Sequence, residues 1–142
     1  MVISFNNLGV TICIVSLVLL VFINSFTSRE PYDIEDFEGK WKGVYMNSLI
    51  TLDISNDNTC YLEFKNSLND DIEIFEGSCN ISNQKYPTVF SIKNISNRSF
   101  SMYSLIKKVN KTSIQLTVFS TKWRLRHVSF NNENIITLSK TF

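Results

Sequence analysis

From Gly39 onward the chain consists of short segments in which apolar and polar residues alternate, and this pattern constrains the fold most. Alternation with a period of two is typical of β-strands that bury one face. Clusters of Asn, Asp and Ser, which favour tight turns, separate the segments. The strands expected from this pattern are 40–46, 48–55, 58–66, 71–79, 86–95, 99–108, 112–120, 121–130 and 134–140.

Eight or nine short strands joined by tight turns predict an all-β domain over residues 39–142. We expect a small antiparallel up-and-down β-barrel, because closure removes the exposed edges of a sheet. A β-sandwich is the competing architecture. The chain length of 142 residues fits one such domain.

Residues 1–28 carry no charged side chain, and 8–26 form an apolar run of nineteen residues. A helix of about 20 apolar residues crosses a bilayer core, so we expect a membrane partner for this run. The segment before it has no Lys or Arg, which favours an uncleaved signal-anchor over a signal peptide. Cleavage near Thr27 is the alternative and yields a secreted protein. Residues 29–38 are acidic and contain Pro31, which favours a linker or a short helical lid.

Two cysteines lie in the expected barrel, and Cys13 lies in the apolar run. In a hairpin centred on 67–70, Cys60 falls opposite Cys79 on one face, at a separation that a disulfide spans. The same register places Glu63 opposite Glu76, and a slip or a bulge would relieve that repulsion. We expect a disulfide, and hence an extracytoplasmic compartment, the periplasm or the cell surface. Two buried free thiols are the alternative.

The charges are divided between the two halves of the sequence. Residues 1–83 hold four basic and twelve acidic residues, whereas 84–142 hold ten basic residues and one acidic residue. The halves can neutralise each other in a closed barrel, or the basic half can face anionic headgroups or an acidic protein partner. Nucleic acid is not expected as a partner of an anchored, extracytoplasmic domain.

The sequence contains little that points to catalysis. His127 is the single histidine, and no hydrolase, metalloprotease, phosphate-loop or Cys-x-x-Cys motif occurs. We therefore expect no enzyme, no metal site and no cofactor, and we expect His127 to share a strand face with Trp123 and Leu125.

The segment 36–45, with Gly39-Lys40-Trp41 near its start, resembles the opening of a lipocalin-type barrel. In that family the Trp of a Gly-x-Trp motif closes the narrow end of the barrel, and a late Arg or Lys packs across it. The resemblance implies that Arg124 or Arg126 takes this place, as a cation over the indole. The runs 103–109 and 113–116 are similar to the later hairpins of small bacterial lipocalin-like domains.

Two functions follow as expectations. The first is a membrane-anchored, extracytoplasmic lipocalin-like protein that binds a small apolar ligand or lipid in its interior. The aromatic residues expected to line that interior are Trp41, Phe64, Phe75 and Trp123. The second is a membrane-tethered interaction module, such as an assembly factor, inhibitor or immunity-type protein, with a basic C-terminal surface. The cations expected on that surface are Lys107, Lys108, Lys122, Arg124 and Arg126.

Overall fold

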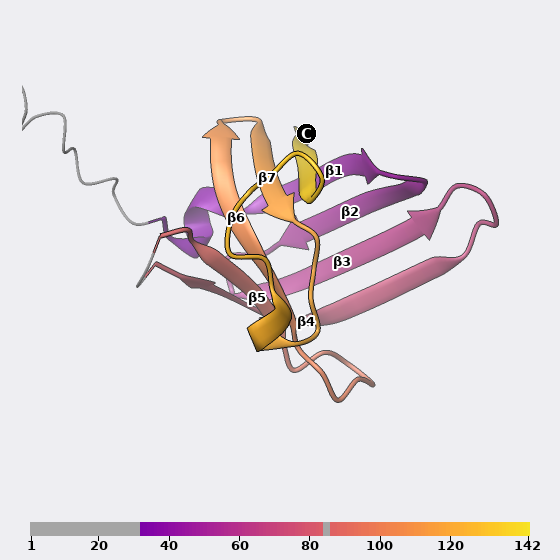
Figure 1. The fold of residues 1–142 in the computed structure, drawn as a ribbon, viewed down its shortest axis with the longest axis horizontal. Coiled ribbons are helices and arrows are strands. Elements are labelled where there is room, and N and C mark those ends of the chain that lie inside the picture. The colour runs from indigo at the N-terminus through magenta and orange to yellow at the C-terminus, as the bar shows by residue number, and fades with distance from the viewer. Residues whose placement is uncertain (1–31, 84–85) are drawn as a thin grey trace, which may run out of the picture. The chain divides into compact units, whose positions relative to one another are not determined.

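Eight antiparallel strands, each paired with its neighbours in the chain, close into a barrel in the computed structural model (Figure 1). The structure describes residues 32–83 and 86–142. The strands are β1 (Gly39–Tyr45), β2 (Ser48–Ile54), β3 (Thr59–Asn66), β4 (Ile72–Ser82), β5 (Val89–Lys93), β6 (Met102–Asn110), β7 (Ser113–Thr117) and β8 (Ile135–Thr141). The expected closed antiparallel barrel is confirmed, and the sandwich alternative is excluded.

The anchor, the cleavage site near Thr27 and the membrane contact expected for 1–28 lie outside the described residues. Within 32–83 and 86–142, neither helix is long or apolar enough to span a bilayer.

Alternation along the strands builds the core inside the barrel. On β2, for example, Ile50, Leu52 and Ile54 are fully buried and face inward. Figure 1 shows β1 to β4 running side by side, with β6 and β7 crossing them steeply. Burial of these apolar side chains is the main force that stabilises the domain.

A short 3-10 helix, η1 (Ile34–Phe37), precedes the barrel and belongs to its core. The Asp33 side chain accepts a hydrogen bond from the Ile34 amide over 2.6 Å, and Asp36 accepts one from the Asp33 amide over 3.0 Å. These carboxylates satisfy amides that the short helix leaves unpaired. Phe37 is fully buried, so the short-helix alternative describes this part of the 29–38 segment.

The expected strand over 121–130 is wrong. Residues 118–134 instead form a loop that contains a 3-10 turn, η2 (Trp123–Leu125), and we call these residues the η2 loop. The physical reason is closure: β8 pairs with β7 on one side and with β1 on the other. No sheet edge remains for another strand. The face predicted for Trp123, Leu125 and His127 is therefore absent, and Trp123 and Leu125 are exposed.

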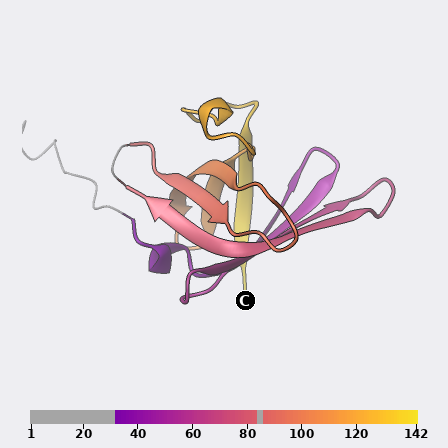
Figure 2. The ribbon, with the colours of Figure 1, turned by 90° about the horizontal axis from the view of Figure 1, so that it is seen from below.

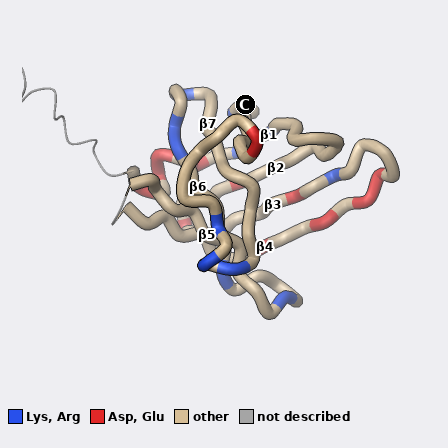
Figure 3. Tube along the Cα trace, viewed as in Figure 1, with Lys and Arg blue, Asp and Glu red and all other residues tan. Residues whose placement is uncertain are grey.

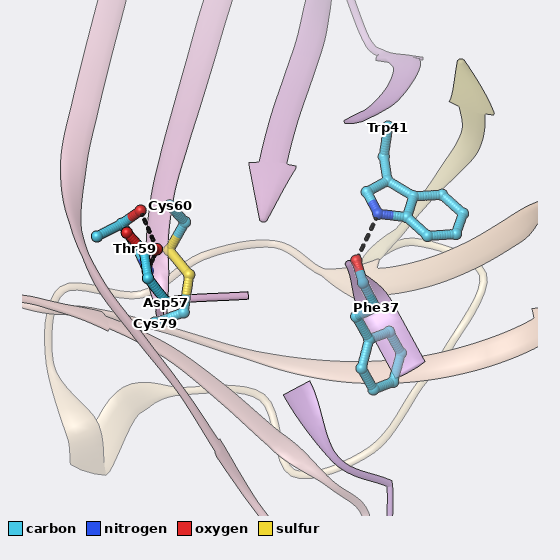
Figure 4. Close-up of a disulfide and its surroundings, with 6 residues drawn as sticks. All are labelled: Phe37, Trp41, Asp57, Thr59, Cys60 and Cys79. Atoms are coloured by element: carbon cyan, nitrogen blue, oxygen red, sulfur yellow. Dashed lines mark hydrogen bonds between the residues drawn. A yellow bond between two sulfur atoms is a disulfide. The ribbon is translucent and has the colours of Figure 1, made fainter. Parts of the chain in front are cut away.

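The disulfide between Cys60 and Cys79 is confirmed, with 5.6 Å between the two Cα atoms (Figure 4). The predicted register is wrong by two residues, because Cys60 lies opposite Gly77 and Glu63 lies opposite Ile74. A shift of two residues leaves every side chain on its face, since the period of a strand is two. It also separates Glu63 from Glu76. A disulfide is typical of proteins in oxidising, extracytoplasmic compartments.

Candidate ligand-binding groove

Trp41 lies at the end of the barrel that η1 covers. Its indole Nε1 donates a hydrogen bond to the carbonyl oxygen of Phe37 over 2.8 Å (Figure 4). The cation over its ring is Lys140 of β8, whose Nζ lies 5.3 Å from the ring centroid. A Cβ at Gly39 would lie 2.7 Å from Cε of Lys140, so the glycine makes room for the lysine to reach the indole. The assignment of this place to Arg124 or Arg126 is wrong, because both lie on the η2 loop.

Phe64 and Phe75 lie in a cluster of phenylalanine rings inside the barrel. Ring centroids are 6.1 Å apart for Phe64 and Phe75, and 6.3 Å apart for Phe64 and Phe119. Phe100 contacts Phe75, and Phe90 contacts Phe119, at similar distances and in tilted or edge-to-face orientations. Such pairs stabilise beyond their buried area. The cluster joins β3, β4 and β5 to the loops that follow β5 and β7.

Sequence alternation identified two members of this cluster and missed the others. Phe90 lies on a strand that the pattern predicts, and its inward direction follows from the alternation of β5. Phe100 and Phe119 fall within the expected strands 99–108 and 112–120, but β6 begins at Met102 and β7 ends at Thr117. Both residues therefore lie in loops, where strand alternation does not give the direction of a side chain.

Trp123 is not inside the barrel. It is half exposed on the η2 loop and lies against the outer face of β6, where its ring centroid is 5.2 Å from that of Tyr103. The reason is the missing ninth strand described above.

A groove lies on the outside of the barrel, between the η2 loop and the outer faces of β5 and β6. Its volume is about 570 Å³. The residues that line it are Ser82, Tyr86, Pro87, Val89, Leu105, Trp123, Arg126 and Val128. An adjoining cleft of about 280 Å³ shares Ser82, Val89 and Trp123 with it and adds Lys93 and Tyr103. The floor is apolar because Val89 and Leu105, paired across the two strands, both point outward.

Polar contacts hold the η2 loop over this floor. Asn134 is buried; its side-chain oxygen accepts from the Asn131 amide over 3.0 Å, and its side-chain nitrogen donates to the Ser129 carbonyl over 3.1 Å. The same nitrogen lies 3.0 Å from Nδ1 of His127. His127 is therefore placed as a loop residue. Backbone hydrogen bonds in both directions between Tyr103 and Ser120 fasten the start of the loop to β6.

Arg126 supplies a positive charge at the wall of the groove. Its guanidinium carbon lies 3.6 Å from the centroid of the Trp123 ring, and one terminal nitrogen donates to the Trp123 carbonyl over 2.9 Å. Its Nε is buried and has no hydrogen-bond partner among the described residues. Buried polar atoms of this kind are nearly always paired, so this guanidinium keeps an unused hydrogen-bond donor beside the groove.

The cations predicted to form one basic surface are not brought together. Lys108 forms an ion pair with Asp36 at 3.4 Å, and Lys107 lies over the Phe130 ring at 4.4 Å. Lys122 and Arg124 are exposed on the η2 loop. Figure 3 shows this cationic stretch near β5, and the acidic residues of the β3–β4 hairpin in a different region. Among residues 32–83 and 86–142, no cluster of three or more potential metal ligands is found.

The fold and the groove together define a closed, eight-stranded antiparallel barrel with a loop-covered cleft on its outer face. No protein-family model, no curated protein and no solved structure matches this chain.

Proposed function

We propose that this protein is a lipocalin-like binding barrel for a small amphipathic molecule that has an apolar body and an anionic group. The proposed site is the groove under the η2 loop. The observation that carries the proposal is Arg126, which lines the groove with its guanidinium stacked on Trp123 and has an Nε without a hydrogen-bond partner among the described residues. The proposal includes attachment to a membrane through residues 8–26, with the barrel on the extracytoplasmic side.

The size and lining of the groove support this class of ligand. Small-molecule sites typically have volumes of about 300–1,000 Å³, with apolar walls and a few polar groups. The groove, at about 570 Å³, is within that range. Leu105, Val89 and Val128 offer contacts to an alkyl or ring system.

The charge of the wall supports an anionic group in the ligand. A guanidinium binds a carboxylate or phosphate through parallel charge-assisted hydrogen bonds. In this protein the Arg126 guanidinium stacks on the Trp123 ring and donates a hydrogen bond to the Trp123 carbonyl oxygen. These two contacts hold the Arg126 side chain in place before a ligand arrives. A side chain fixed in this way loses little entropy on binding.

A titration with two matched probes tests the proposal. Dodecanoate and dodecanol share one alkyl chain and differ in charge, and their binding to the full chain in mild detergent is followed by tryptophan fluorescence. We expect dodecanoate to bind more tightly, and Arg126→Gln to weaken dodecanoate by about tenfold or more, because a hydrogen bond to a charged group contributes roughly 1.5–3 kcal/mol.

Two further variants sharpen the titration. Leu105→Phe, which fills the floor, should weaken both probes, and Arg124→Gln, an exposed cation of the same loop, should leave both unchanged. The proposal is overturned if wild type binds dodecanoate and dodecanol equally tightly and Arg126→Gln binds both probes as wild type does. So does the absence of binding together with no ligand in the native mass spectrum of protein purified from membranes.

The second candidate function is a membrane-tethered interaction module with an acidic protein partner. Lys122 and Arg124 favour it, because both are exposed and neither forms an ion pair with a carboxylate among the described residues. Recovery of such a partner from membranes should fall steeply with added salt and with reversal of both charges. Recovery that is insensitive to both changes contradicts this candidate.

A further inference from the structure

The η2 loop exposes three large apolar side chains. Trp123, Leu125 and Val128 are 48%, 69% and 71% exposed. Figure 2 shows the loop projecting beyond the strands of the barrel. Isolated apolar residues are common on protein surfaces, but three within six residues of one projecting loop form a local apolar patch.

Cations lie close to these side chains in the sequence, and the one carboxylate of the η2 loop, Glu133, lies near its C-terminal end. Lys122 and Arg124 flank Trp123, and residues 118–132 contain no Asp or Glu. The loop is therefore net positive, with Lys122, Arg124 and Arg126 against the single Glu133. Anionic surfaces attract such a segment.

The loop is held in the exposing conformation. The buried Asn134 side chain bonds to two backbone groups of the loop, and Lys107 lies over the Phe130 ring. Arg126 stacks on one face of Trp123. These contacts fix the loop in a conformation that leaves Leu125 and Val128 exposed and one part of Trp123 accessible beside its contact with Tyr103.

We propose that the η2 loop rests on an anionic lipid bilayer, with Trp123, Leu125 and Val128 in the interfacial region and Lys122 and Arg124 at the headgroups. Tryptophan favours the membrane interface, and apolar insertion combined with basic side chains is the usual means of surface binding. A stable protein partner buries roughly 800 Å² on each side, which is more than three side chains of one loop provide. A bilayer needs no such complementary shape. The proposal depends neither on groove occupancy nor on residues 8–26.

The test uses the full chain in nanodiscs, with tryptophan quenching by brominated lipid as the measurement. One set of discs contains phosphatidylcholine alone, and the other contains phosphatidylcholine and phosphatidylglycerol at about 7:3. Trp41 is buried and supplies a constant background. We expect strong quenching in the anionic discs and weak quenching in the neutral ones, with the difference removed by Trp123→Phe.

Charge and apolar variants separate the two parts of the contact. K122E/R124E should remove the preference for anionic lipid, since each cation near such a surface strengthens binding about fivefold. L125S/V128S should lower quenching in both discs. The control K42E/K111E reverses two exposed lysines elsewhere and should behave as wild type. Leu105→Phe blocks the proposed groove and should leave quenching unchanged, which distinguishes this proposal from the ligand site.

Several outcomes overturn the proposal. One is quenching that is equal in the two discs, and another is quenching that K122E/R124E leaves unchanged. A third is protection of Trp123 from acrylamide by polyglutamate but not by anionic vesicles, which assigns the loop to an acidic protein surface instead.

Discussion

The indole nitrogen of Trp41 donates a hydrogen bond to the carbonyl oxygen of Phe37 over 2.8 Å, and both residues are fully buried (Figure 4). This bond fastens η1 to β1. It also pairs the indole N–H, which would otherwise be costly in the core. The Gly-x-Trp segment thus closes one end of the barrel.

Trp41→Phe should lower the free energy of unfolding by about 2–4 kcal/mol, because it leaves the Phe37 carbonyl unpaired and opens a cavity. The measurement is urea unfolding of the full chain in mild detergent. Trp123→Phe, on the half-exposed loop, is the matched control and should cost less than about 1 kcal/mol. Equal losses for the two variants contradict the assigned role of Trp41.

Removal of the disulfide by C60A/C79A should lower the free energy of unfolding by about 3 kcal/mol, which is the chain-entropy estimate for a closed loop of this size. The two cysteines are 19 residues apart in the sequence. For the wild-type protein, the free energy of unfolding measured with reductant should be lower than that without reductant by a similar amount. The unfolding free energy of the variant should not change with reductant. A wild-type protein whose stability is the same in both conditions argues against the bond.

Asn134→Ala should loosen the η2 loop, because its side chain bonds to the backbone at Asn131 and Ser129. Trypsin cleavage after Lys122, Arg124 or Arg126 should then be faster, and dodecanoate binding should weaken along with it. Asn132→Ala changes an exposed neighbour and is the control. If cleavage proceeds at the wild-type rate in Asn134→Ala, these contacts do not hold the loop.

Tyr61 should make stability depend on pH in the alkaline range. Its hydroxyl donates to Glu63 over 2.5 Å, and this bond, with burial and the charges of Glu63 and Glu76, raises the pKa of Tyr61 to about 12 from 10.0. The folded state holds this proton more tightly than the unfolded state. The unfolding free energy should therefore fall as the pH rises from 10 to 12.

Tyr61→Phe removes this group and should flatten that part of the curve. Urea midpoints at pH 8, 10 and 11 for the two proteins give the difference directly. A wild-type curve parallel to that of Tyr61→Phe across this range contradicts the assignment.

Much of the barrel follows from local alternation. β7 illustrates this, since Ile114 and Leu116 share a face in the sequence pattern and are both buried in the core. The pattern also pairs Cys60 with Cys79, because an antiparallel hairpin brings them to one face. It does not distinguish registers that differ by two residues, since both keep the same faces.

The groove under the η2 loop could be predicted from the sequence less well than the barrel. Alternation in 121–130 resembles that of a strand, but whether such a segment finds a partner depends on distant strands. The groove needs Val89 and Leu105 from adjacent strands and Arg126 from a loop. No local pattern contains those three positions together.

The class of the domain, the direction of most strand side chains and the pairing of the two cysteines follow from the sequence, because they depend on period, turn residues and short-range contacts. Tertiary structure decided which strand closed the barrel, which cation lies over Trp41 and where the groove forms. Closure of β8 onto β1 uses the last free sheet edge. That long-range pairing leaves the η2 loop outside the sheet. Trp123 and Arg126 therefore lie on the outer face of the barrel and not in its core.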